Sequence, residues 1–125
     1  GMLTNFSEIK RRIQKLEDMR LAKTDGSFEK YTKKEQIMLT REMARLEKYF
    51  AGMVGMHKMP DAILIVDQKK EHIATTEAHK LSIPVIAIGN TDASVRAIAY
   101  PIVANDAATS SIGAILTLLT DALKA

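Results

Sequence analysis

The chain has 125 residues, 46% of them hydrophobic and 26% charged, which is enough for one domain with a buried core. It contains no Cys, so disulfides, thiolate metal sites and a Cys nucleophile are excluded. No apolar run approaches the roughly 20 residues that a membrane helix needs, and the charged N-terminus lacks a signal-peptide core. We therefore expect no membrane among the partners.

The net charge of +3 is unevenly distributed along the chain. Residues 1–58 carry 13 Lys and Arg against 8 Asp and Glu, whereas residues 59–125 carry 5 against 7. A basic half favours a polyanionic partner such as nucleic acid. A solvated helix surface rich in Lys explains much of the same excess, so charge alone leaves both interpretations open.

Residues 1–58 have the periodicity of helices. Asn5, with Glu8 three residues later, predicts a capping box, and Thr24-Asp25-Gly26 predicts a turn. Two apolar stripes follow helical spacing: Phe6, Ile9, Ile13 and Leu16, then Leu39, Met43, Leu46 and Phe50. Each stripe is narrow enough to be buried by the other. We therefore predict an antiparallel helical hairpin of the coiled-coil type rather than a membrane-surface helix.

Residues 59–125 change to the pattern of alternating strands and helices. Apolar, β-branched runs at 62–66, 85–88 and 100–103 predict strands, the first of them covered on both faces. A short helix separates the first two strands, and a last helix is predicted to bury a broad stripe of Ala108, Ile112, Ile115, Leu116, Leu119 and Leu123. The order predicts an α/β fold, part of a Rossmann- or flavodoxin-like parallel sheet from which the hairpin protrudes.

This predicted sheet is small for a parallel one, because three short strands and two helices leave one apolar strand edge unprotected. We expect residues 59–125 to be the C-terminal part of a larger α/β domain. We also expect the exposed edge to be a candidate for self-association.

Four polar residues follow the predicted strands and gather at one edge of the sheet, where α/β enzymes place their chemistry: Asp67, Asn90, Asp92 and Asp106. They support an alternative interpretation, a small Rossmann-like nucleotide-binding or enzymatic domain. The interpretation that we favour is structural, since Asp67 and Asp106 can cap the following helices. No Gly-rich phosphate loop is present, and His72 and His79 are too far apart to share a zinc ion. We expect no cofactor and no metal.

Four ordered segments resemble one family, the small-subunit ribosomal protein S2 family in its bacterial and organellar branch. Gly1-Met2-Leu3-Thr4-Asn5 is similar to the family's G-G-x-L-T-N motif, and Gly26-Ser27-Phe28-Glu29-Lys30-Tyr31-Thr32-Lys33-Lys34-Glu35 to its G-x-F-x-x-L-x-K-K-E motif. The third segment, PDAILIVDQKKEHIATTEAHKLSIPVIAI, matches at Pro60, Asp61, Asp67, Glu71, Glu77, Ala78 and Ile83-Pro84. The fourth comprises Tyr100-Pro101-Ile102, Asn105-Asp106-Ala107 and Ser111-Ile112.

The chain departs from the family pattern in two loops and in extent. Gly89-Asn90-Thr91-Asp92-Ala93 stands where the family has D-T-N-x-D-P, and Ile102-Val103-Ala104-Asn105-Asp106 where it has I-P-G-N-D. The family also carries an N-terminal helix and further strands before the first motif. Those elements fall outside this sequence, which agrees with the incomplete sheet predicted above.

The resemblance implies a non-enzymatic constituent of the small ribosomal subunit, in the bacterial cytoplasm or in an organelle. It implies small-subunit rRNA and neighbouring small-subunit proteins as partners, including protein S1 in bacteria. Basic side chains on a rigid hairpin can neutralise phosphates. The expected RNA-binding residues are Thr4, Asn5, Lys10, Arg11, Arg12, Lys15, Lys33, Lys34 and Arg41.

Overall fold

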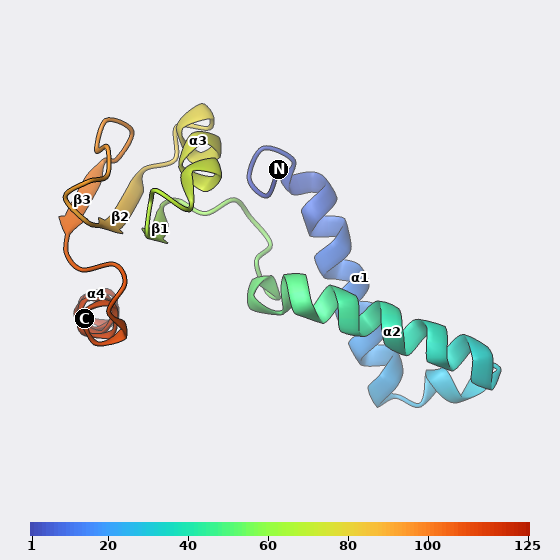
Figure 1. Ribbon diagram of the computed structural model, residues 1–125. Coiled ribbons are helices and arrows are strands. Elements are labelled where there is room, and N and C mark those ends of the chain that lie inside the picture. The colour runs from blue at the N-terminus through green and yellow to red at the C-terminus, as the bar shows by residue number, and fades with distance from the viewer. The chain divides into compact units, whose positions relative to one another are not determined.

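The structure is a computed structural model that describes residues 1–125 (Figure 1). Its contacts divide the chain into two compact units. The helical unit is Asn5–Met59, and the α/β unit combines Gly1–Thr4 with Pro60–Ala125. No helix in either unit is both long and apolar enough to cross a membrane.

The helical unit contains the predicted hairpin. Helix α1 (Phe6–Thr24) is followed by a 3₁₀ turn (Ser27–Lys30), helix α2 (Lys33–Phe50) and a second 3₁₀ turn (Ala51–Met53). A buried cluster joins the helices, and it consists mainly of the predicted stripe residues: Ile13, Leu16, Met19, Leu46 and Phe50. The two helices cross (Figure 1), so the middle of α1 packs on the C-terminal part of α2. The first turns of α2 therefore stay largely exposed.

The predicted capping box at the start of α1 is wrong. Asn5 is the N-cap, but its side chain accepts no capping hydrogen bond, and Glu8 instead pairs with Arg11 and Arg12. The backbone explains the difference, because Asn5 has φ −125° and ψ 47° rather than the extended conformation that an N-cap residue normally adopts.

A capping box does form at the start of α2. Thr32 is extended, and its hydroxyl accepts from the Glu35 amide while the Glu35 carboxylate accepts from the Thr32 amide at 2.9 Å. Gly26, in the predicted turn before it, has φ +77°, a conformation that glycine adopts without strain. The turn chemistry therefore fixes where α2 begins.

The α/β unit is built on a three-stranded parallel sheet in the order β1-β2-β3. Its strands are β1 (Ile63–Val66), β2 (Val85–Gly89) and β3 (Tyr100–Val103), with α3 (His72–Lys80) between the first two and α4 (Thr109–Lys124) after the third. The register pairs Ile63 with Val85 in β1 and β2, and Ile86 with Tyr100 in β2 and β3. The buried core lies mainly on the central strand, with contributions from β1, α3 and the first residues of the chain: Val85, Ala87, Ile88, Ile65, Ala78 and Leu3.

Coverage of the sheet is smaller than the sequence predicts, and two expectations are wrong. Leu64 in β1 is 42% exposed, so that strand is not covered on both faces. Helix α4 has no buried residue, and its Leu123 is 89% exposed. The reason is that α3 alone packs on β1 and β2, while α4 makes no extensive contact with another element. The apolar stripe on α4 is therefore only half-buried, and its last residue, Leu123, is exposed.

Candidate nucleic-acid interface

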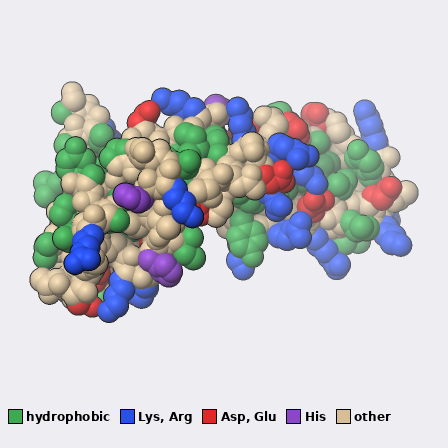
Figure 2. All heavy atoms as spheres, turned by 90° about the horizontal axis from the view of Figure 1, so that it is seen from above, with side chains coloured by type: hydrophobic (Ala, Val, Ile, Leu, Met, Phe, Trp, Pro, Cys, Tyr) green, Lys and Arg blue, Asp and Glu red, His purple; other side chains and the backbone are tan.

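The basic side chains of the helical unit surround its buried core. The cluster around Leu16 and Phe50 faces inward, so the polar positions of both helices face solvent. Figure 2 shows Lys and Arg side chains at several places along the surface, interspersed with acidic and hydrophobic ones. The seven cations predicted to bind RNA all lie on these two helices: Lys10, Arg11, Arg12 and Lys15 on α1, and Lys33, Lys34 and Arg41 on α2.

Three of these seven cations are paired with acids. Arg11 and Arg12 both contact Glu8, at 3.0 and 3.6 Å. Lys15 donates to Glu42 on the other helix at 2.5 Å, and this hydrogen bond lowers the pKa of Glu42 below its ordinary value. Exposed pairs of this kind stabilise a fold by about 1 kcal/mol at most, so a phosphate can compete for the cation.

A fourth ion pair was missed by the sequence reasoning. Arg20, where the first stripe ends, makes two parallel hydrogen bonds of 2.6 Å to the Glu47 carboxylate. They lower the pKa of Glu47 and raise that of Arg20. This fork geometry holds α1 and α2 together beyond the apolar cluster.

The other four predicted cations have no acidic partner: Lys10, Lys33, Lys34 and Arg41 are exposed and form no ion pair. Lys33 and Lys34 occupy the first turn of α2, where the positive end of the helix dipole disfavours a cation. The one acid of that turn, Glu35, is already hydrogen-bonded within the capping box. The start of α2 is therefore a site of uncompensated positive charge.

Thr4 and Asn5 were predicted from the family motif, and the structure places them in different surroundings. The Thr4 amide and hydroxyl both donate to Glu77 of α3, at 3.0 and 3.2 Å. Asn5, the next residue, is exposed and belongs to the helical unit. Thr4 is thus engaged within the protein, whereas the Asn5 side chain accepts no capping bond.

Glu77 is a buried acid whose role the sequence reasoning missed. Its carboxylate accepts from the Leu3 amide at 2.8 Å and forms an ion pair with the amino group of Gly1, in addition to its two bonds from Thr4. The Gly1 amine, more than the backbone hydrogen bonds, lowers the pKa of Glu77 from 4.5 to about 2. Glu77 therefore anchors the first four residues to the α/β unit.

The strand ends bring together the four polar residues of the alternative interpretation. The Asp106 carboxylate accepts from the Asn90 amide at 3.2 Å, and Asp92 pairs with Lys69 at 2.9 Å. Asp67 accepts from the Lys70 amide and pairs with the Lys70 ammonium at 2.8 Å. The hydrogen bond from Lys70 lowers the pKa of Asp67, as that from Lys69 lowers the pKa of Asp92.

The prediction that Asp67 and Asp106 cap helices is wrong. The N-caps of α3 and α4 are Glu71 and Ala108, and neither helix has a side-chain cap. Asp67 instead ends β1 with φ +61° and holds the turn that precedes α3. Asp106 links the loops that follow β2 and β3. Both acids have structural roles, although different ones from those predicted.

A hollow of about 350 Å³ lies beside these strand ends, lined by Lys69, His72, Thr76, Asp92, Ser94 and Arg96 among others. Its charges are partly balanced, since Lys69 and Asp92 pair with each other. No group of three or more His, Asp or Glu side chains is arranged to hold a metal ion. The arrangement offers no set of groups with evident catalytic roles.

Comparison with known proteins agrees with the resemblance in the motifs. A family model described as Ribosomal protein S2 matches residues 1–125. The chain is 46% identical over 123 residues to the small ribosomal subunit protein uS2 of Nocardia farcinica, covering 98% of this chain and 43% of that protein. It is also 46% identical over 123 residues to the uS2 of Dictyoglomus thermophilum, covering 98% and 50%, respectively.

The fold and the charged surface define an α/β protein with a partial parallel sheet and a basic helical hairpin. The chain belongs to the ribosomal protein S2 family. It spans about half the length of the curated relatives that it matches.

Proposed function

We propose that the chain is a structural constituent of a small ribosomal subunit and binds small-subunit rRNA through basic side chains of the helical unit. Membership of the S2 family is the observation that carries this proposal. The geometry supports it, because four cations on α1 and α2 have no acid to neutralise them. Structured RNA is bound mainly through its backbone and its shape, which suits cations on a rigid scaffold.

Within the basic set, the cations without partners are the primary contacts. Lys33 and Lys34 stand at the positive end of α2, where a phosphate would relieve both the like charges and the helix dipole. Lys10 and Arg41 add unpaired charge elsewhere on the two helices. Arg11, Arg12 and Lys15 bind phosphate only in competition with Glu8 and Glu42. Asn5, which is exposed at the start of α1, has a secondary role, whereas the Thr4 amide and hydroxyl are engaged by Glu77.

The proposed setting is the ribosome, in the bacterial cytoplasm or in an organelle, and the proposed role is not enzymatic. The absence of enzymatic activity is supported by the strand-end acids Asp67, Asp92 and Asp106, each of which has a partner within the protein. Neighbouring small-subunit proteins, including S1 in bacteria, are the proposed protein partners. Two further surfaces are available for self-association, namely the edges of β1 and β3.

The experiment that tests this function is equilibrium binding of the chain to small-subunit rRNA, with large-subunit rRNA as competitor. We expect a preference for small-subunit rRNA, and a loss of about tenfold or more when Lys33→Glu and Lys34→Glu are combined. The matched control reverses two exposed cations of the α/β unit, Lys80→Glu with Lys124→Glu, and leaves affinity unchanged. Equal binding of both rRNAs, or equal loss in the control, would contradict the proposal.

A further inference from the structure

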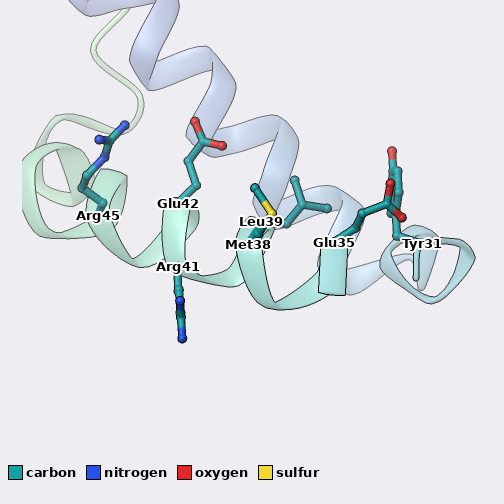
Figure 3. Close-up of a pocket in the computed structure, with 7 residues that line it drawn as sticks. All are labelled: Tyr31, Glu35, Met38, Leu39, Arg41, Glu42 and Arg45. Carbon is teal, nitrogen blue, oxygen red and sulfur yellow. The ribbon is translucent and has the colours of Figure 1, made fainter. Parts of the chain in front are cut away.

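The exposed part of α2 carries a groove that the basic interface does not explain. This α2 groove is a hollow of about 530 Å³ that Figure 3 shows from the side, and its main lining residues are Tyr31, Met38, Leu39, Arg41, Glu42 and Arg45. Met38 is 62% exposed and Tyr31 49% exposed. The cluster that joins the helices is centred further along α2, so the groove is left open.

The floor of the groove is apolar and adaptable. Leu39 packs partly on the buried cluster, which fixes its position, while Met38 projects beside it into solvent. Met side chains adjust to the shape of a binding partner, and they recur on surfaces that bind protein segments. A second hollow with an exposed apolar residue, Ile37 at 53%, lies on the neighbouring face of α2 and shares Arg41 with the first.

The groove carries two cations and two acids, and its charge is positive overall because a cation from outside it pairs with one of the acids. Lys15, at 2.5 Å, compensates the charge of Glu42, whereas Glu35, which also lines the groove, stays ionised with its hydrogen bonds from Thr32. Neither Arg41 nor Arg45 forms an ion pair. In Figure 3, Arg45 extends on one side of α2 and Arg41 on the other. Two guanidinium groups without an ion pair thus follow the apolar floor along α2, on its C-terminal side.

We propose that the α2 groove docks an acidic amphipathic segment of another protein. Its apolar side chains cover Met38 and Leu39, and its carboxylates meet Arg41 and Arg45, the planar cations best suited to carboxylate. Single-stranded RNA fits less well, because its bases need aromatic platforms, and the groove offers one ring, Tyr31, beside two aliphatic side chains. Arg41 is common to the two proposed surfaces, whereas Met38, Leu39 and Arg45 belong to the groove alone and Lys33 and Lys34 to the rRNA contact alone.

The test follows the methyl resonance of Met38 in the whole chain, with the other six Met residues as internal references. The probes are a short peptide with Leu at helical spacing and Glu at the flanking positions, the same peptide with Lys in place of Glu, and oligouridylate. We expect the acidic peptide to shift the Met38 methyl. The basic peptide and the oligonucleotide should leave it unchanged.

Two variants locate the contact. Met38→Ser and Arg45→Glu should each weaken binding of the acidic peptide by about tenfold or more. Leu21→Ser, a similar change at a 66% exposed position on α1 outside the groove, should not. Binding of rRNA should be the same for Met38→Ser and the unaltered chain, which separates this proposal from the proposed function. No shift with the acidic peptide, an equal shift with the basic one, or a shift with oligouridylate alone would overturn the proposal.

Discussion

Replacement of Glu77 by Gln tests whether this buried carboxylate anchors the first residues of the chain. The change keeps the size of the side chain but removes the charge that accepts from Leu3 and Thr4 and pairs with the Gly1 amine. The pKa of Glu77 falls from 4.5 to about 2 in the folded protein. Since each pKa unit corresponds to about 1.36 kcal/mol, the ionised form contributes up to roughly 3 kcal/mol to folding of the α/β unit while the Gly1 amine, the largest cause of the lowered pKa, is free and charged.

The pH dependence of this stabilisation has a definite sign. A lowered pKa means that the ionised carboxylate is favoured in the folded state, so the contribution is complete above the ordinary pKa of 4.5. It declines as pH falls from 4.5 through about 2, and at pH 3 roughly 1 kcal/mol of it remains. The difference between Glu77→Gln and the unaltered chain should therefore be large at pH 7 and small at pH 3.

Urea denaturation at the two pH values measures the difference in free energy of unfolding, and hydrogen exchange at the Leu3 and Thr4 amides reports the anchor locally. The matched control is Glu71→Gln, at the exposed N-cap position of α3, whose side chain makes no capping hydrogen bond. Acetylation of the Gly1 amine removes the largest cause of the lowered pKa and should reproduce part of the loss. Equal stability of Glu77→Gln and the unaltered chain at pH 7, with unchanged exchange, would refute this reasoning.

Three further changes test how the turns are built. Thr32→Ala should lower the free energy of unfolding of the helical unit by about 1 kcal/mol, because it removes the hydroxyl that caps α2. Asn5→Ala should have no effect, since the Asn5 side chain makes no capping hydrogen bond. Thermal melts followed by circular dichroism compare the two variants. Gly26→Ala should lower the free energy of unfolding by about 1 kcal/mol, because an Ala residue is strained at φ +77°. Gly52→Ala should leave the free energy of unfolding unchanged, because Gly52 has open space around it and no positive φ. The denaturant midpoints of the two variants measure the difference. Asp67→Val should lower the denaturant midpoint more than Asp67→Asn, because Asn tolerates the φ of +61° and retains an acceptor for the turn. The opposite ranking in any of these pairs would contradict the account of that turn.

The elements that depend on local pattern could be predicted from the sequence. The apolar spacing of Ile13, Leu16, Leu46 and Phe50 predicts two helices that bury one another, and these residues form most of the cluster. The β-branched run that ends at Val66 is a strand, and the parallel order follows from the helix between β1 and β2. The T-x-x-E pattern of Thr32 and Glu35 was also available as a capping signal, although Asn5 and Glu8 offered a similar one that the backbone does not use.

Features that join distant parts of the chain were beyond that reasoning. Glu77 and Leu3 are 74 residues apart, and only the position of Glu77 beside buried Ala78 signals that its carboxylate needs a partner. The incomplete burial of α4 could not be predicted from its apolar stripe, because a stripe indicates which face can be covered and not what covers it. The contact between Asp106 and Asn90 depends in the same way on how two loops meet.

The central claim is that cations without acidic partners on the helical unit bind rRNA, and the salt dependence of binding tests it most directly. The slope of log affinity against log salt counts the phosphates that a protein neutralises, at roughly one for each cation in contact. The account predicts a steep slope for the unaltered chain and a slope smaller by about 3 when Lys10, Lys33 and Lys34 are changed to Gln together. An unchanged slope in that variant would contradict it.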